Sequence, residues 1–440
     1  MKRLVTSLIL MIPFSVAAQW ELEEIFEDTI PHANQLRLEV LDEHKVLMIP
    51  LTTYQDRYII KTEDGGLTWT KYELPEDIMG TVLYEADFVN EEVGYIVGGT
   101  PFGAWNVILK TEDGGMHWTA LDHSFLESAG SYGIENVSFA SDGTGYIAAA
   151  YQGVYKTTDG GLTFTALELP VVEGSFDTRV AEIKFIDQEV GLVSCFGYRP
   201  ADSSYVSYIL KTTDGGNSWS VADERTWNDP GEWHHVDKIH FVNANDVFAI
   251  GGKGYLKVSP DGGESWIHRA LPDPAGTATD IFFVNNACGY IVMSDKIYRT
   301  DNAGQSWVLQ SFATEYNTAH YIQFANDSIG YAAGNYHLFV DPFTTLFKSL
   351  QPASSPLSVY TAGLRSHFKI YPNPACAILT LEYESKVQIQ SIQLFDIGGK
   401  LIKAFDKDQK ALDIGDIADG VYFLNIQAEE GNMSEKIIVN

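Results

Sequence analysis

A nine-residue segment occurs six times between residues 61 and 307, and this repeat limits the possible folds more than any other feature. The copies read KTEDGGLTW, KTEDGGMHW, KTTDGGLTF, KTTDGGNSW, VSPDGGESW and RTDNAGQSW. Their fourth residues are 49, 46, 55, 47 and 41 positions apart, at Asp64, Asp113, Asp159, Asp214, Asp261 and Asn302. A period in the forties is the length of one four-stranded repeat unit.

The rest of each period predicts four short strands. A hairpin signal precedes each segment, as in FVNEEVGYIVGG from Phe88 and FASDGTGYIAAA from Phe139. A third strand enters the segment and a fourth leaves it, with no helical periodicity between them. These features predict an all-β chain with a seven-bladed β-propeller, six to eight blades being compatible with the count. A strand near Trp20 is expected to complete the last blade.

The repeated segment has the chemistry of a tight turn. Its Asp side chain can accept hydrogen bonds from backbone amides of the same turn, the glycines permit a positive φ, and the aromatic ring fills space between sheets. We therefore expect structural roles for Asp64, Trp69, Asp113, Trp118, Asp159, Phe164, Asp214, Trp219, Asp261, Trp266, Asn302 and Trp307.

The pattern T-x-D-G-G-x-x-W resembles the Asp-box, or BNR repeat, of sialidases, sortilin-type receptors, xyloglucan hydrolases and the photosystem II assembly-factor family. The assembly-factor type is the most similar in sequence. These families share the repeat but have unrelated activities, so the resemblance implies the architecture and leaves the activity open.

The two ends of the chain carry export features. Residues 1–18 read as a signal peptide, 19–350 as the propeller, 351–367 as a linker and 368–440 as a small antiparallel β-sandwich. The last segment contains YPNP, LFDIGGKLI and ADGVYFLNI in that order, and it resembles the C-terminal sorting domain of type IX secretion cargo. The resemblance implies passage through the periplasm, the outer-membrane type IX machinery as a partner, and a secreted or surface location.

The composition excludes several partners. The chain has 59 acidic and 29 basic residues and a net charge of -30, so nucleic acid and anionic membrane surfaces would repel it. After the signal peptide no apolar stretch has the length of a membrane span. No cofactor motif is present, and the adjacent His234 and His235 would point to opposite faces of a strand, so no metal site is predicted.

Long connections on the face opposite the repeated turns hold the candidate ligand-binding residues. Unusual aromatic and polar residues gather there, as expected of a binding site. The candidates are Trp105, Arg179, Arg199, Trp227, Trp233, His234 and His235.

The sequence favours a non-enzymatic propeller that binds a protein or a glycan. The alternative is a sialidase-like glycoside hydrolase that uses the propeller mouth and would require two carboxyl groups about 5 to 10 Å apart. The Arg-Ile-Pro motif of sialidases is absent, because its nearest equivalent is Thr29, Ile30 and Pro31.

Overall fold

The computed structural model divides the chain into two compact units, one with Glu21–Gln310 and Thr314–Leu357 and the other dominated by Ser358–Asn440. The predicted signal peptide and linker lie outside the described residues, as do Trp105 and Trp233. The structure describes residues 20–26, 36–50, 57–78, 80–100, 106–124, 133–149, 153–170, 176–229, 234–252, 254–273, 276–310, 318–336, 343–349, 368–375, 377–383, 389–396, 401–418, 420–428 and 431–439.

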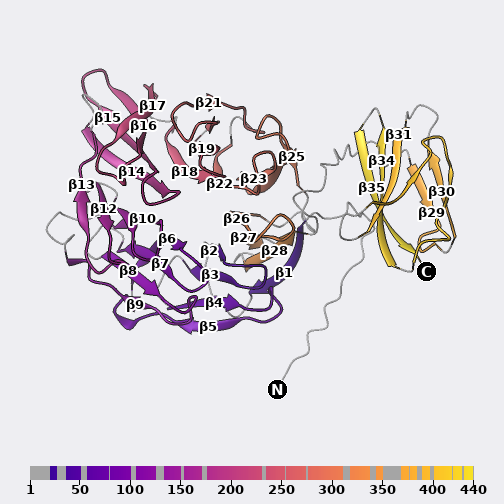
Figure 1. Ribbon diagram of the computed structural model, residues 1–440, viewed down its shortest axis with the longest axis horizontal. Coiled ribbons are helices and arrows are strands. Elements are labelled where there is room, and N and C mark those ends of the chain that lie inside the picture. Colours follow the sequence, from indigo (N-terminus) through magenta and orange to yellow (C-terminus); the bar gives the residue numbers. More distant parts are fainter. Residues whose placement is uncertain are drawn as a thin grey trace. The chain divides into compact units, whose positions relative to one another are not determined.

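The larger unit is a β-propeller whose described residues form seven four-stranded antiparallel sheets (Figure 1). Sheet 1 contains β2 (Leu36–Val40), β3 (Val46–Pro50), β4 (Tyr58–Thr62) and β5 (Thr70–Glu73). A 3-10 turn, η1 (Glu76–Ile78), follows it. Sheet 2 contains β6 (Val82–Phe88), β7 (Gly94–Gly99), β8 (Asn106–Thr111) and β9 (Thr119–Ala120). Sheet 3 contains β10 (Ile134–Phe139), β11 (Gly145–Ala149), β12 (Gly153–Thr157) and β13 (Thr165–Leu167).

The remaining sheets follow the same order from the innermost to the outermost strand. Sheet 4 contains β14 (Phe176–Phe185), β15 (Gly191–Arg199), β16 (Ser204–Thr212) and β17 (Ser220–Trp227). Sheet 5 contains β18 (Val236–Phe241), β19 (Val247–Gly251), β20 (Leu256–Ser259) and β21 (Ile267–His268). Sheet 6 contains β22 (Ala278–Phe283), β23 (Gly289–Met293), β24 (Lys296–Thr300) and β25 (Val308–Leu309).

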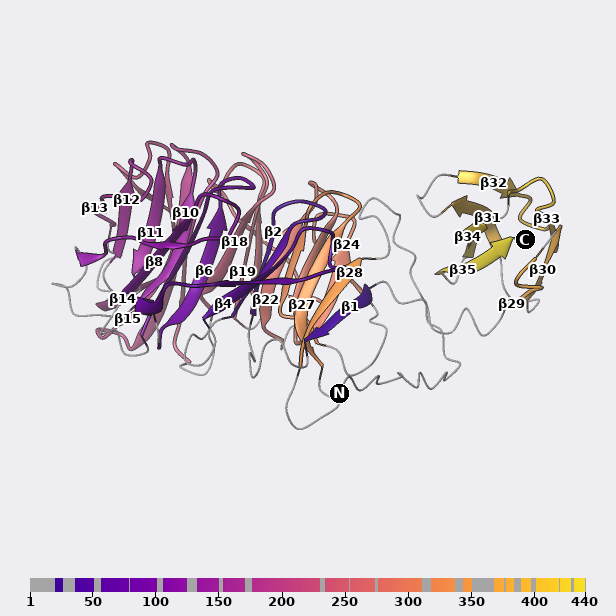
Figure 2. The same ribbon diagram turned by 90° about the horizontal axis from the view of Figure 1, so that it is seen from below.

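Sheet 7 joins the two ends of the propeller. It contains β26 (Tyr321–Phe324), β27 (Gly330–Tyr336), β28 (Phe343–Ser349) and, as its outer strand, the N-terminal β1 (Trp20–Phe26). In Figure 2 the strands run between the two faces of the propeller. β1 pairs with β28, so the last sheet has four strands like the others.

In five of the seven sheets, a phenylalanine and a glycine pack together in the hairpin of the first two strands. A Cβ placed on Gly94 would lie 2.4 Å from the ring of Phe88, and the same conflict recurs for Gly145, Gly191, Gly289 and Gly330. The residue after the glycine then packs on the next sheet, since the Tyr95 ring stacks on Phe139 with centroids 3.5 Å apart. The hairpin signal in the sequence is therefore a packing motif within and between sheets.

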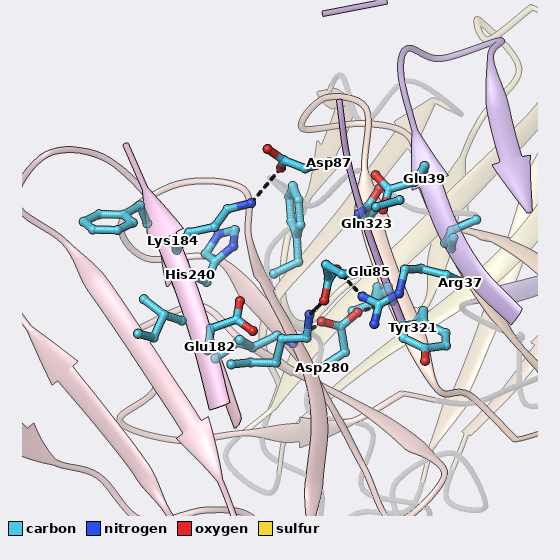
Figure 3. Close-up of a pocket in the computed structure, with 18 of the residues that line it drawn as sticks. Arg37, Glu39, Glu85, Asp87, Glu182, Lys184, His240, Asp280, Tyr321 and Gln323 are labelled. Carbon is cyan, nitrogen blue, oxygen red and sulfur yellow. Dashed lines mark hydrogen bonds and ion pairs between the residues drawn. The ribbon is translucent and has the colours of Figure 1, made fainter. Parts of the chain in front are cut away.

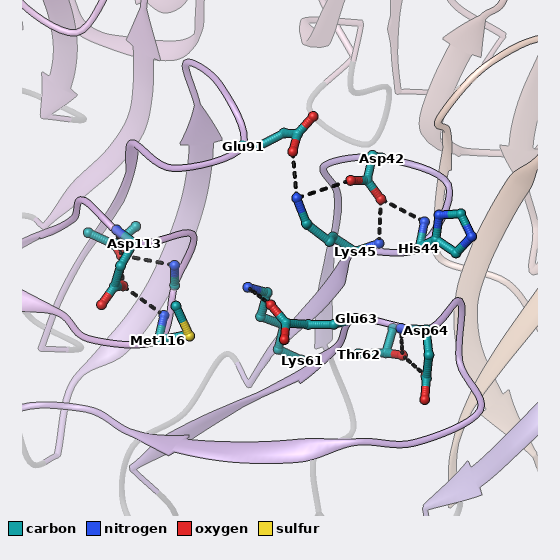
Figure 4. Close-up of polar contacts among 12 residues, drawn as sticks. Asp42, His44, Lys45, Lys61, Thr62, Glu63, Asp64, Glu91, Asp113 and Met116 are labelled. Atoms are coloured by element: carbon teal, nitrogen blue, oxygen red, sulfur yellow. Dashed lines mark hydrogen bonds and ion pairs between the residues drawn. The ribbon is translucent and has the colours of Figure 1, made fainter.

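The repeated turns have a common hydrogen-bond network. Thr62 donates its hydroxyl proton to Asp64 (2.8 Å) and accepts the Gly66 amide proton (2.9 Å). The Thr68 amide and hydroxyl both donate to the Asp64 carboxylate, at 2.8 and 2.6 Å, and Trp69 Nε1 donates to the Gly66 carbonyl. Figure 4 shows Thr62 beside Asp64. Equivalent networks surround Asp113, Asp159, Asp214 and Asp261.

The C-terminal unit is a small antiparallel sandwich. One sheet contains β29 (Phe368–Tyr371), β30 (Ile378–Tyr383) and β33 (Ala411–Asp413), and the other contains β31 (Ile389–Asp396), β32 (Leu401–Phe405), β34 (Gly420–Ala428) and β35 (Gly431–Val439). Alternate side chains of both sheets, including Leu381, Leu394 and Leu424, form one buried core. The sequence predicted this sandwich from its alternating pattern.

Candidate functional site

A cavity of about 380 Å³ lies among the innermost strands of the propeller. The charged residues of its lining alternate with apolar residues along the strands, as in Arg37-Leu38-Glu39 and Glu85-Ala86-Asp87. Figure 3 draws the polar side chains that point into it. The labelled residues are Arg37, Glu39, Glu85, Asp87, Glu182, Lys184, His240, Asp280, Tyr321 and Gln323.

A row of hydrogen bonds joins neighbouring innermost strands at the level of the cavity. In four of the sheets, a side chain in the same strand position accepts an amide proton from the next sheet. The acceptor and donor residues are Asp87 and Phe139 (2.6 Å), Ser138 and Phe185 (3.0 Å), His240 and Phe283 (3.0 Å), and Gln323 and Val40 (2.7 Å). These bonds tie the strands around the cavity together.

His240 has a structural role within this row. Burial lowers the pKa of its imidazole to about 4, so the ring is neutral at neutral pH. The amide of Phe283 donates to its Nε2 atom, which requires that this nitrogen carry no proton. His240 is therefore a buried acceptor, and this contact leaves its Nε2 unable to act as a metal ligand.

Two ion-pair groups neutralise part of the acidic lining. Glu85 pairs with Arg37 and, at 3.1 Å, with Lys238 Nζ. Lys184 Nζ lies 2.9 Å from an Asp87 oxygen. Burial alone would raise the pKa of Glu85, but attraction to Arg37 and Lys238 outweighs it and lowers that pKa. Glu85 is thus held as a carboxylate.

Glu39 and Glu182 have no such partner. Their side chains are buried, with 9% and 5% of each residue exposed, and neither carboxyl makes a hydrogen bond or ion pair with the residues that the structure describes. Burial, with repulsion from Glu85, raises the pKa of Glu39 to about 8. Burial also raises the pKa of Glu182 to about 7. Both groups bind protons more readily than an exposed glutamate does.

Asp280 is an intermediate case in the same cavity. Its carboxylate accepts the amide protons of Ile281 (3.0 Å) and Ile322 (2.8 Å). Burial nevertheless raises its pKa to about 6. Its oxygens already have backbone donors, so it is a less available partner for a ligand than Glu39 or Glu182.

Sheet 4 brings several of the sequence-predicted residues together. Its strands have 8 to 10 residues, and the β15–β16 hairpin turns at Arg199 and Ser204 on the face opposite the repeated turns. Arg199 Nη2 on β15 lies 2.7 Å from Glu224 on β17, on the far side of β16. The long strands therefore carry candidate residues outward on the predicted binding face.

Trp227 lies in an aromatic cluster on this extension. Its ring stacks on Tyr205 with centroids 5.7 Å apart and meets the ring of His234 edge-on at 5.8 Å. Tyr198 packs against Tyr205 at 5.2 Å. Trp227 is only 8% exposed, whereas Tyr198 and Tyr205 are half-buried. The accessible aromatic surface of the cluster therefore comes mainly from the two tyrosines.

His235 and Arg179 belong to a second group beside this cluster. His235 stacks on Phe196 at 4.3 Å and lies 2.7 Å from Asp237, and Arg179 pairs with Glu135. His234 and His235 thus contact different rings. Among the residues that the structure describes, no group of three His, Cys, Asp or Glu side chains could hold a metal ion.

The sequence interpretation missed the cavity residues. The sequence does carry a signal for them. Of the three residues before each hairpin phenylalanine, the first and the third face the centre of the propeller and the second faces away from it. The segments read EADF, NVSF, EIKF, KIHF, DIFF and YIQF, with RLEV in sheet 1. Aligning the repeats at the phenylalanine would have placed the charged residues on one inner wall.

Comparison with known proteins identifies the C-terminal segment. Residues 369–440 match the family described as the secretion system C-terminal sorting domain. The C-terminal unit is a type IX sorting domain. The protein is therefore type IX secretion cargo, located at the cell surface or outside the cell. In the described part of the chain, no helix combines the length and apolar character needed to cross a membrane.

Solved structures support the fold of the larger unit. YCF48 bound to D1 peptide has a TM-score of 0.50 at 15% identity, covering 79% of this chain and 100% of that one. YCF48 from Cyanidioschyzon merolae has a TM-score of 0.52 at 15% identity, covering 75% and 98%. A chain of the mitotic checkpoint complex has a TM-score of 0.50 at 10% identity, covering 79% and 98%. No curated protein matches the sequence.

Proposed function

We propose that this exported protein is a non-enzymatic propeller that binds a protein or a glycan on the face opposite the repeated turns. The extension of sheet 4 is the observation that carries this proposal. It presents Tyr198 and Tyr205 as half-buried aromatic rings and Arg199 beside Glu224. Aromatic rings next to polar groups suit both sugar stacking and protein contacts.

The other candidate residues have graded roles within this proposal. Trp227 packs on Tyr205, and His234 packs on Trp227. His235 packs on Phe196, and Arg179 forms an ion pair with Glu135. Trp105 and Trp233 remain candidates from sequence alone. YCF48 has been solved with a D1 peptide, which is a precedent for peptide binding by this fold and assigns no ligand here.

A glycan array and a pull-down from a surface extract, both with the purified full chain, test the binding role. Tyr205→Ala combined with Arg199→Ala should abolish the capture seen with the parent protein while leaving the melting temperature within a few degrees. Tyr72→Ala, at a half-buried position on the outer strand of sheet 1, is the control. Unchanged capture by the folded double variant would place the ligand site elsewhere.

Residues 368–440 are proposed to engage the outer-membrane type IX machinery. Deleting residues 369–440 should retain a folded propeller in the periplasm, because the sorting signal is lost while the propeller core is untouched. Immunoblots of cell fractions and medium measure this. Normal delivery of the truncated chain to the surface or medium would contradict the proposal.

Glycoside hydrolysis is a second candidate because Glu182 has the raised pKa of a general acid and lies near the ionised Glu85. The pairing of Glu85 with Arg37 and Lys238 makes it a poor nucleophile. In assays with fluorogenic sialosides and other glycosides, the parent protein should show no more turnover than the Glu182→Gln variant. Turnover that depends on Glu182 would favour the hydrolase.

A further inference from the structure

The cavity in the propeller has more acidic than basic side chains. Its lining includes five carboxyl groups and three cationic groups, together with the neutral His240. Three of the carboxyls have ion pairs or backbone donors, as described above. The two that remain, Glu39 and Glu182, are at least nine-tenths buried and point into the cavity (Figure 3). A buried carboxylate without a partner is costly, so a cationic partner would stabilise it.

A metal ion does not fit these two groups. Glu39 comes from β2 and Glu182 from β14, and Figure 3 shows them on different sides of Glu85. Ca²⁺ requires six to eight oxygen ligands around one point. The described residues offer no group of three suitable ligands. A ligand with separate positive groups suits the arrangement better.

The size and the apolar part of the lining favour an organic cation. A volume of about 380 Å³ lies within the range of small-molecule sites. Phe282 and Tyr321 also line the cavity, and aromatic rings attract ammonium groups and cover alkyl chains. An alkyl chain with an amino group at each end would place one charge near each unpaired carboxylate.

We propose that the propeller cavity binds an alkyl diamine whose two ammonium groups pair with the carboxylates of Glu39 and Glu182. The proposal is independent of the ligand on the sheet 4 extension, because the two sites use different residues. Binding forms two charge-assisted ion pairs and breaks no covalent bond. In the absence of the ligand, protons take the place of the ammonium groups on these carboxyls.

Competition between the diamine and protons gives the site a characteristic pH dependence. Raising the pH through the raised pKa values of Glu182 and Glu39 removes their protons, so diamine affinity should rise by up to about tenfold per pH unit for each proton released. Affinity should fall again as the amines deprotonate near pH 10. Other charged and titratable groups also face the cavity. They are Arg37 on β2, Glu85 and Asp87 on β6, Lys184 on β14, Lys238 on β18, Asp280 on β22 and Tyr321 on β26.

Isothermal titration calorimetry with 1,4-diaminobutane and the purified full chain tests the proposal. We expect saturable binding that strengthens between about pH 6 and about pH 9, with proton release detected as a dependence of the enthalpy on the buffer. The neutral 1,4-butanediol should not bind. No saturable heat at 10 mM diamine (roughly the weakest affinity expected of a functional site) and about pH 8.5 would overturn the proposal.

Isosteric variants locate the site. Glu182→Gln and Glu39→Gln should each weaken diamine binding by roughly ten- to hundredfold, because each replaces a charged acceptor of an ammonium group by a neutral one. Glu189→Gln removes the same charge from an exposed position of sheet 4 and should leave the affinity unchanged. Equal effects of all three variants would show binding to the acidic surface in general and would overturn the proposal. Thermal melting confirms that each variant is folded.

Discussion

Asp64 and Glu39 belong to the same four-stranded sheet, but their carboxyl groups have opposite surroundings. Asp64 lies in the exposed turn between β4 and β5, where the Thr68 hydroxyl and amide and the Thr62 hydroxyl donate to it and lower its pKa to about 2. Glu39 lies on the innermost strand, where burial raises its pKa to about 8. In the repeated turns, which form the rim of the propeller, donors of the same turn stabilise the charged carboxylate. At the centre, on the innermost strands, the charge of a carboxyl group depends on groups from other sheets.

The comparison therefore separates two kinds of acidic residue in one propeller. The rim carboxylates are each satisfied within a single turn, so the same solution can be repeated in every sheet. The central carboxyls are balanced across sheets, so each one depends on a different neighbour. Changes at the centre should therefore have larger and more pH-dependent effects than changes at the rim.

Loss of a central cation should produce the largest effect. Lys238→Met leaves Glu85 with Arg37 alone and removes the positive charge that attracts Glu182 most strongly, so we expect a loss of about 3 to 5 kcal/mol in the free energy of unfolding. Urea denaturation at about pH 8 measures this. The loss should shrink at about pH 5, where Glu182 is protonated in both proteins.

A surface cation is the control for that experiment. Lys45 pairs with Glu91 at 2.5 Å on an exposed turn (Figure 4), and exposed pairs contribute little. Lys45→Met should change the free energy of unfolding by less than about 0.5 kcal/mol. Equal losses in the Lys45 and Lys238 variants would show that the central charges are no more strongly coupled than the surface ones.

Replacement of Glu39 should have a smaller effect on stability, and it should stabilise the protein at alkaline pH. The folded protein holds a proton on Glu39 up to about pH 8, whereas an unfolded glutamate loses its proton near pH 4.5. Between these values the folded state binds more protons, so stability falls as the pH rises. Glu39→Gln should remove the part of this slope that Glu39 contributes and make the variant more stable than the parent at about pH 9, by up to a few kcal/mol.

Melting curves from about pH 5 to about pH 9 test this sign. Glu91→Gln, at an exposed position, is the control and should keep the slope of the parent protein. A Glu39 variant that is less stable than the parent at the alkaline end would mean that the ionised carboxylate has a stabilising partner, contrary to the interpretation of this cavity.

The repeat made most of the propeller predictable from the sequence. The box and the Phe–Gly hairpin recur because each satisfies its own hydrogen bonds and packing within about ten neighbouring residues, and such local motifs keep a recognisable spacing. The sorting domain was predictable for a similar reason, since its motifs follow one another in a fixed order and its strands alternate.

The cavity was not predictable in the same way. Arg37 is 48 residues before Glu85, and Lys238 is 153 residues after it, so the pairing appears only when the sheets close around a centre. Trp227 shows a related limit. The sequence predicted it as a ligand-binding residue, but only strand pairing shows that it lies opposite Tyr205 and is 8% exposed.

A single rim carboxylate should contribute less than the central groups. Asp64→Ala removes the acceptor of three hydrogen bonds in one of six repeated turns, so we expect the melting temperature to fall by only a few degrees. Because its pKa is lowered, Asp64 stabilises the fold above about pH 4, and the benefit disappears as the pH falls through about 2.

Differential scanning calorimetry of parent and Asp64→Ala proteins should therefore show transitions that converge with acidification. Asp77→Ala, at an exposed position of η1, is the control and should have no pH-dependent difference. A constant difference at all pH values would mean that Asp64 acts through packing and not through its charge.

The sixth repeated turn provides the most specific test, with the smallest expected change in stability. Asn302 replaces the usual aspartate there, its Nδ2 donates to Ser306 Oγ at 2.8 Å, and its Oδ1 accepts the Ser306 amide proton at 2.9 Å. In the four aspartate turns that have Ser or Thr at the equivalent position, the hydroxyl is the donor, as in Ser265 to Asp261. A hydroxyl can rotate to reverse its role, so Asn302→Asp should keep both hydrogen bonds and change stability by less than about 0.5 kcal/mol. Asn302→Ala should lose both and melt at a lower temperature than either. If Asn302→Asp is as unstable as Asn302→Ala, the rim network depends on the donor direction, and the six turns are not interchangeable.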